Sequence, residues 1–139
     1  MIQVEHISKR YGDHVAVEDL SFTVEKGQIY GFLGPNGAGK STTMNIMTGY
    51  IAAGSGCVRI NGFDILTEPE KAKKCIGYLP EIPPLYTDMT VYEYLMFVAE
   101  LKKVPKKERV SHVEEIIGRT QLEEVEGRLI RNLSKGFKQ

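Results

Sequence analysis

The chain has 139 residues, of which 42% are hydrophobic and 26% charged, so neither a disordered protein nor a coiled coil is indicated. Its formal net charge is zero, from 18 basic and 18 acidic side chains, which argues against a nucleic-acid-binding protein. Cys57 and Cys75 form no metal-binding or disulfide pattern. We find no signal-peptide pattern and no apolar run long enough for a membrane helix, and therefore expect a globular, cytoplasmic chain.

Glycine is the one unusual component of this composition. The chain holds 14 glycines, and nine of them lie between Gly27 and Gly62. Alternating apolar and polar residues predict half-exposed strands at 2–5 and 20–24. Residues 28–33 are almost continuously apolar, which predicts a strand covered on both faces in a parallel sheet.

Helical and hairpin patterns follow the glycines. Apolar residues that recur after Lys40 predict a helix ending near Gly49. Further along, the pattern predicts a strand at 57–60, a hairpin turn at Asn61-Gly62 with a returning strand at 63–65, a short helix at 69–74 and a short strand at 76–79.

The second half of the sequence, beyond a proline-rich loop, is predominantly helical. Thr90 and Glu93 have the spacing of a capping box, and the apolar periodicity predicts a helix over 91–103. A second helix is predicted to start at Pro105 and to end near Gly118. We therefore expect a first part at residues 1–81, with mixed strands and helices, and a helical part at 82–139.

A glycine-rich segment with a single lysine carries the clearest chemistry. It matches the phosphate-binding pattern G-x-x-x-x-G-K-[ST], it follows a predicted strand, and it precedes a predicted helix. Glycines let backbone N–H groups converge on phosphate oxygens, and the start of a helix adds a positive dipole end. The expected nucleotide-binding residues are Gly34, Pro35, Asn36, Gly37, Ala38, Gly39, Lys40, Ser41 and Thr42.

Three side chains of this segment have distinct expected roles. Lys40 would reach the β and γ phosphates, the Ser41 hydroxyl would coordinate Mg2+, and the Thr42 hydroxyl would bind a phosphate oxygen. The alternative is a glycine-rich turn that happens to carry a surface lysine.

The order of the motifs resembles that of the ATP-binding subunits of ABC transporters, over essentially the whole chain. The resemblance implies a P-loop NTPase (RecA-like) α/β core with an antiparallel β side sheet and a helical subdomain. It further implies that Tyr11, in the run Lys9-Arg10-Tyr11-Gly12, stacks on adenine and that Ala16 lies beside the nucleotide. Ordinary packing would also explain Ala16.

A second family motif departs from its usual form here. Residues 76–80 resemble the lead-in to a loop whose glutamine contacts Mg2+ or the attacking water, but the glutamine position holds Glu81. A carboxylate can still bind Mg2+ or accept a hydrogen bond from water. A solvated loop glutamate is the alternative. The Glu form and the prolines that follow it resemble an exporter-type branch of the family.

A third motif lies at 133–139, where the sequence resembles a degenerate Leu-Ser-Gly-Gly-Gln signature. By this resemblance Ser134 and Gly136 meet the γ phosphate held by a second ATP-binding subunit, although Ser134 is equally a natural N-cap. No Asp or Glu follows Ser134, and the three histidines precede it, so the family's Mg2+-binding aspartate, general-base glutamate and switch histidine have no counterparts in this sequence.

Together these motifs predict the ATP-binding, ATP-hydrolysing subunit of an ABC exporter, incomplete at its C-terminus. ATP and Mg2+ are the expected cofactors, with a second ATP-binding subunit and a membrane permease as partners, no nucleic acid, and a location at the cytoplasmic side of the membrane. Two alternatives stay open: a fragment that binds nucleotide without hydrolysing it, and an ABC ATPase that is not tied to transport.

Overall fold

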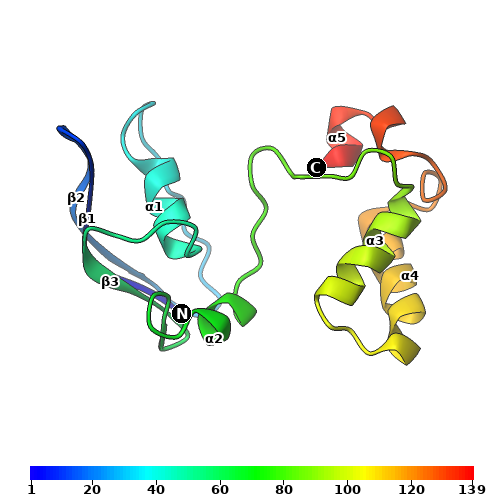
Figure 1. Cartoon of the computed structure of the whole chain (residues 1–139), viewed down its shortest axis with the longest axis horizontal. Helices are drawn as coiled ribbons and strands as arrows, with labels where there is room; N and C mark the ends of the chain where they lie inside the picture. The colour runs from blue at the N-terminus through cyan, green and yellow to red at the C-terminus, as the bar shows by residue number, and fades with distance from the viewer. The chain divides into compact units, whose positions relative to one another are not determined.

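The computed structural model describes residues 1–139, which divide into two compact units, Met1–Tyr78 and Leu79–Gln139 (Figure 1). Each unit has its own hydrophobic clusters. None of the helices is long and apolar enough to cross a membrane.

A four-stranded antiparallel sheet forms the base of the first unit. Its strands are β1 (Ile2–Tyr11), β2 (His14–Val24), β3 (Ser55–Ile60) and β4 (Phe63–Asp64), in the order β2-β1-β3-β4. The predicted Asn61-Gly62 turn is confirmed, since Ile60 pairs with Phe63 across it. Both turn residues have positive φ, as this type of tight hairpin requires.

Two helices pack against this sheet, α1 (Lys40–Met47) and α2 (Pro69–Lys74). Both predicted helices are confirmed, and α2 has the predicted bounds because Pro69 is favoured in a first helical turn. Alternation along the strands turns one face of the sheet toward the helices. The resulting core consists of Val4, Ile7, Val17, Ile46, Val58, Ile60, Ile65 and Ala72.

The predicted buried strand at 28–33 is wrong for this chain. The segment forms no strand, and its Ile29 and Leu33 side chains are 99% and 93% exposed. The Phe22 ring of β2 contacts two rings of the segment, with its centroid 5.4 Å from that of Tyr30 and 5.8 Å from that of Phe32. A strand exists only through a ladder of hydrogen bonds, and no neighbouring strand pairs with this segment.

The predicted strand at 76–79 is wrong for the same reason. These residues have no assigned strand and no ladder partner. Of the two, only the segment at 28–33 was predicted to lie in a parallel sheet. The antiparallel strands pair with one another within residues 1–78. Among the strands expected within residues 1–78, those of the antiparallel side sheet are the ones that form.

The second unit is helical, as predicted, with α3 (Val91–Leu101) and α4 (Arg109–Thr120) packed against each other. The capping box is confirmed: the Thr90 hydroxyl accepts from the Glu93 N–H at 3.2 Å, and the Glu93 carboxylate accepts from the Thr90 N–H at 2.8 Å. Shorter helical turns complete the unit, namely η1 (Lys106–Glu108), η2 (Ile130–Asn132) and α5 (Lys135–Lys138).

Candidate functional site: a phosphate-binding loop

The glycine-rich segment forms an exposed loop that ends at the first residue of α1 (Figure 1). Within it, the Ala38 N–H donates to the Pro35 carbonyl at 3.2 Å, which closes a turn. Gly37 and Gly39 have φ values of +86° and +82°, a left-handed conformation that side chains other than glycine rarely adopt. The loop thus delivers the chain into the start of a helix, where backbone N–H groups have no partner within the helix.

Gly39 is also the point at which the loop touches the sheet. A Cβ atom added to Gly39 would collide with the Ala16 carbonyl oxygen of β2 and would lie 3.1 Å from Cγ2 of Val17. Only a residue without a side chain can approach the strand so closely. The structure therefore brings together Ala16 and Gly39, two of the residues that the sequence proposed for the site.

Lys40 extends back over its own loop. Its Nζ atom donates to the carbonyl oxygens of Gly34 at 2.6 Å and Pro35 at 2.7 Å. Because the side chain is only half-buried, the ammonium remains open to solvent while fixed against the start of the loop. A point charge in this place can compensate an anion bound by the loop N–H groups.

Three consecutive hydroxyl residues follow Lys40, and the structure gives them different environments. Thr43 is buried, and its Oγ1 donates to the Gly39 carbonyl at 3.0 Å, in addition to the helical bond from its N–H. Ser41 is exposed and Thr42 half-buried. Thr43 thus locks the loop to the helix, a role that the sequence analysis missed because three adjacent hydroxyls look alike until burial separates them.

Tyr11 stands at the end of β1, next to the tip of the β1–β2 hairpin. Its side chain is 50% exposed, and the Lys9 ammonium lies 5.7 Å from the ring centroid. The ring is therefore not part of the core. An exposed aromatic ring on the strand pair that also carries Ala16 is available to a planar ligand.

The remaining predicted site residues, Glu81, Ser134 and Gly136, belong to the second unit. Glu81 is exposed and has no ion-pair partner. Ser134 caps α5, since its Oγ accepts from the Phe137 N–H at 3.3 Å. The residues proposed from the sequence are thus divided between the two units.

The oxygen donors near the loop show what kind of Mg2+ site the chain could form. The chain has no cluster of three or more His, Cys, Asp or Glu side chains able to hold a metal ion. Ser41 offers one exposed hydroxyl at the second residue of α1. Because Mg2+ is commonly bound by few protein ligands together with substrate phosphates, this donor fits an ion shared with a bound nucleotide and not a protein-only metal site.

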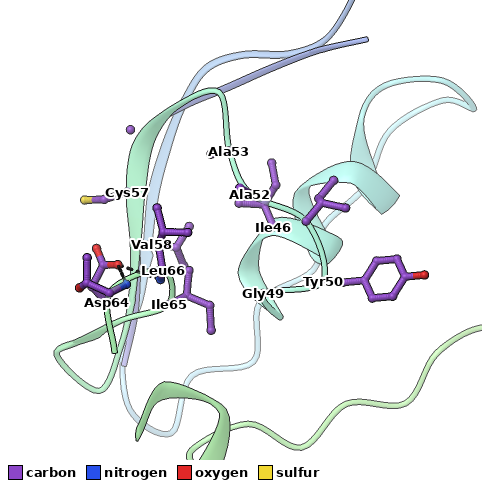
Figure 2. A pocket seen from close by; sticks show the side chains of 13 residues that line it. Ile46, Gly49, Tyr50, Ala52, Ala53, Cys57, Val58, Asp64, Ile65 and Leu66 are labelled. Carbon is purple, nitrogen blue, oxygen red and sulfur yellow. Dashed lines mark hydrogen bonds between the residues drawn. The ribbon is translucent and has the colours of Figure 1, made fainter. Parts of the chain in front are cut away.

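A separate hollow lies at the other end of α1 (Figure 2). It has a volume of about 180 Å³ and a mainly apolar lining that includes Ile46, Tyr50, Val58 and Ile65. Its carboxylate, Asp64, accepts from the N–H groups of Leu66 and Thr67, and these bonds lower the Asp64 pKa. Without a lysine or arginine in its lining, this hollow is poorly suited to phosphate.

Glu5, Arg59 and Cys57 form a hydrogen-bonded group on β1 and β3. Arg59 donates to Glu5 at 2.7 Å, which lowers the pKa of the Glu5 carboxyl and raises that of Arg59. The Cys57 thiol also donates to Glu5, at 3.2 Å, and burial followed by this bond raises the Cys57 pKa. A raised pKa keeps the thiol protonated, so Cys57 is not an activated nucleophile.

Comparison with known proteins agrees with this architecture. The ABC transporter family profile matches residues 17–139, and the chain therefore belongs to this family. A solved structure of the ATP-binding subunit of an ABC transporter superposes with a TM-score of 0.85 at 30% identity, covering 99% of this chain and 57% of the other. CbiO1 of Clostridium perfringens, part of the ABC transporter complex cbiONQ, superposes with a TM-score of 0.84 at 26% identity, covering 99% and 57%.

Two curated relatives are ATP-binding proteins with 34–40% sequence identity to this chain. The linearmycin resistance ATP-binding protein LnrL of Bacillus subtilis (strain 168) is 40% identical over 124 residues, which cover 87% of this chain and 40% of LnrL. The bacitracin transport ATP-binding protein BcrA of Bacillus licheniformis is 34% identical over 139 residues, covering 100% of this chain and 44% of BcrA. The chain thus spans less than half the length of these relatives. The α/β P-loop NTPase fold expected from the sequence is confirmed by the solved structures.

Proposed function

We propose that this chain carries the nucleotide-binding part of an ATP-binding subunit of an ABC transporter. The observation that carries the proposal is the loop at residues 34–39, seated on β2 through Gly39 and fixed by the Lys40 ammonium at its start. The relatives that are named ATP-binding proteins support ATP as the ligand.

The proposal gives each residue of the first unit a task. Backbone N–H groups of the loop bind phosphate oxygens, and Lys40 moves from the carbonyls of Gly34 and Pro35 to compensate the phosphate charge. The Ser41 hydroxyl would hold one coordination position of a Mg2+ ion shared with the nucleotide, an ion that would supply screening of the charge between the phosphates. Tyr11 and Ala16 accommodate the base.

The second unit would contribute to an assembly. Glu81 is proposed to face the metal-bound phosphates, and Ser134 and Gly136 to meet the nucleotide held by a second ATP-binding subunit. A relative named for bacitracin transport and another named for linearmycin resistance support transport as the process, and we propose export through a membrane permease as its form. In such an assembly the chain would lie at the cytoplasmic surface of the membrane.

MgATP binding to the purified chain tests this proposal, with Lys40→Ala as the loss-of-function variant. Lys26→Ala is the matched control because Lys26 is an exposed lysine of the same unit outside the loop. Calorimetry should show binding to wild type and Lys26→Ala, and at least tenfold weaker binding to Lys40→Ala, as expected for losing a charge-assisted contact. Equal affinities of all three proteins would refute the proposed site.

The same proteins distinguish binding from hydrolysis. Phosphate release that occurs in wild type and disappears in Lys40→Ala would show that the chain is itself an ATPase. Binding without phosphate release would instead favour the alternative of a nucleotide-binding fragment that does not turn ATP over.

A further inference from the structure

The β1–β2 hairpin contains an irregularity that the proposed nucleotide site does not by itself explain. Its register shifts between Val4 and Ile7 and again between Ile7 and Lys9. In the first interval β1 has an extra residue, and in the second β2 has one, so the two bulges compensate each other. Each bulge holds a residue other than glycine in the left-handed conformation, His6 at φ +50° and Asp19 at φ +45°.

Side chains tie the two bulges to each other across the strands. The His6 Nδ1–H donates to Asp19 Oδ1 at 2.7 Å, because a carboxylate only accepts. The His6 N–H donates to the Ser21 hydroxyl at 2.8 Å, and the Asp19 N–H donates to the Ser8 hydroxyl at 3.0 Å. The Ser21 and Ser8 hydroxyl groups thus accept hydrogen bonds from the His6 and Asp19 N–H groups, which have no cross-strand carbonyl partner where the register of β1 and β2 shifts.

This arrangement is poorly explained as a contribution to stability. The His6 and Asp19 side chains are 77% and 72% exposed, and contacts between side chains this exposed contribute little to stability. A left-handed φ is energetically unfavourable at residues other than glycine. Bulges kept at a cost typically redirect a strand or aim a side chain.

The bulges lie between the regular part of the hairpin and the part that reaches the phosphate loop. Beyond them Lys9 pairs with Val17, and a third shift leaves Ala16 without a ladder partner. This unpaired residue is the one whose carbonyl meets Gly39. The bulges thus precede, along the hairpin, both the Ala16 contact with the loop and Tyr11, which pairs with His14 at the hairpin end.

The third strand supports the bulge from the other side. The Gly54 N–H donates to the Ser8 carbonyl at 2.7 Å. A Cβ atom on Gly56, which has φ +79°, would collide with the carbonyl oxygens of Glu5 and His6. The β1 backbone at the bulge is thus constrained by β3 and Gly54 on one side, and the His6–Asp19 contact links it to β2 on the other.

From this geometry we infer that His6 and Asp19 are positioning residues for the base end of the nucleotide site: their pair holds hairpin residues 8–17 against the phosphate loop. The inference rests on the proposed function for its ligand. The position of the hairpin relative to the phosphate loop is a property of the chain without ligand, so it can be measured independently of nucleotide binding.

The test uses Asp19→Gly and Asp19→Asn in the full chain. Glycine accepts the left-handed conformation without strain, so Asp19→Gly removes the pair while leaving the bulge free to form. Asparagine keeps an oxygen acceptor for His6 and tolerates the same conformation. Lys71→Ala, which removes another exposed ion pair of the same unit, is the control.

Two measurements are made on each protein. The first is the NMR contact between the Gly39 α-protons and the Val17 methyl group, which reports hairpin position without ligand. The second is the affinity for MgATP compared with Mg-tripolyphosphate, which lacks the base. Asp19→Gly should weaken the NMR contact and lower MgATP affinity by up to about fivefold, the most that an exposed pair of this kind can account for, while tripolyphosphate affinity stays unchanged. Asp19→Asn and Lys71→Ala should resemble wild type.

Each other outcome has a definite meaning. An unchanged NMR contact in Asp19→Gly would overturn the inference whatever the ligand data. Equal losses of MgATP and tripolyphosphate would overturn it as well, because the pair would then act on the whole site. If wild type bound neither ligand, the proposed function would fail, and the NMR comparison would still decide whether the pair holds the hairpin.

Discussion

Gly39 meets two independent requirements, a left-handed backbone and a close approach to the Ala16 carbonyl. We therefore expect Gly39→Ala to destabilise the first unit by about 2 kcal/mol or more, since strain and collision add. Gly37→Ala is the matched control, because Gly37 has the same sign of φ and nothing within 4 Å of an added Cβ. Urea unfolding should show a smaller loss, about 1 kcal/mol, for the control. Equal losses would mean that the contact with β2 does not constrain Gly39.

Tyr11 is half-exposed, so its replacement should change ligand binding without unfolding the unit. If its ring stacks on adenine, Tyr11→Ala should weaken MgATP at least fivefold, as typical for loss of base stacking, and leave pyrophosphate affinity nearly unchanged. Tyr11→Phe should retain MgATP affinity because the ring remains. Competitive calorimetry with the two ligands measures both effects, and a parallel loss of pyrophosphate binding in Tyr11→Ala would exclude stacking.

Among the helices, α3 owes its start to a pair of side-chain bonds between Thr90 and Glu93. Thr90→Ala removes the acceptor for the Glu93 N–H and should destabilise the second unit by about 1 kcal/mol. Thr90→Ser keeps a hydroxyl and serves as the control. Thermal unfolding of the helical signal gives the difference, and an unchanged midpoint for Thr90→Ala would show that the cap is dispensable.

The same cap predicts a dependence on pH. The hydrogen bonds from the Thr90 backbone and side chain hold the Glu93 pKa below its ordinary value. A lowered pKa in the folded state gives stability that is present above the unfolded value and lost as pH falls through the folded value. Glu93→Gln should therefore flatten the acid-side loss of stability of the second unit. An identical pH profile in wild type and Glu93→Gln would contradict this assignment.

Local signals explain why some elements were predicted well from the sequence. The capping box, the Asn61-Gly62 turn and the first-turn proline of α2 act within a few residues, and all three are found where expected. The segments at 28–33 and 76–79 failed because apolar character indicates burial but says nothing about whether a ladder partner exists. Strand formation is a property of pairs, which a single segment cannot reveal.

The candidate site likewise has features that the sequence predicts and features that it does not. The spacing of Gly34, Gly39 and Lys40 predicts a loop at the start of a helix, and that loop is present. The Gly39 contact with Ala16, the buried Thr43 hydroxyl and the His6–Asp19 pair are tertiary features with no local pattern. These features could not be predicted from the sequence because they depend on how β2 approaches α1 and on where the hairpin changes register.

The chain as a whole consists of two units whose cores use separate residues, Val4 among them in the first and Val113 in the second. Each should therefore respond to its own core mutation. Val4→Ala should lower the stability of the first unit by about 2 kcal/mol, and Val113→Ala should do the same for the second. Amide hydrogen exchange, measured separately for the strand amides of the first unit and the helix amides of the second, shows which unit each mutation destabilises. Equal effects of each mutation on both sets of amides would indicate a single cooperative unit.

The segment at 28–33 has a consequence for handling this chain in solution. It carries no charge, its Ile29 and Leu33 side chains face solvent, and its backbone has no ladder partner. Such a stretch is a template for strand exchange between molecules, with self-association that rises with protein concentration. A lysine in place of Leu33, which is almost fully exposed, would interrupt that pairing with little effect on the core.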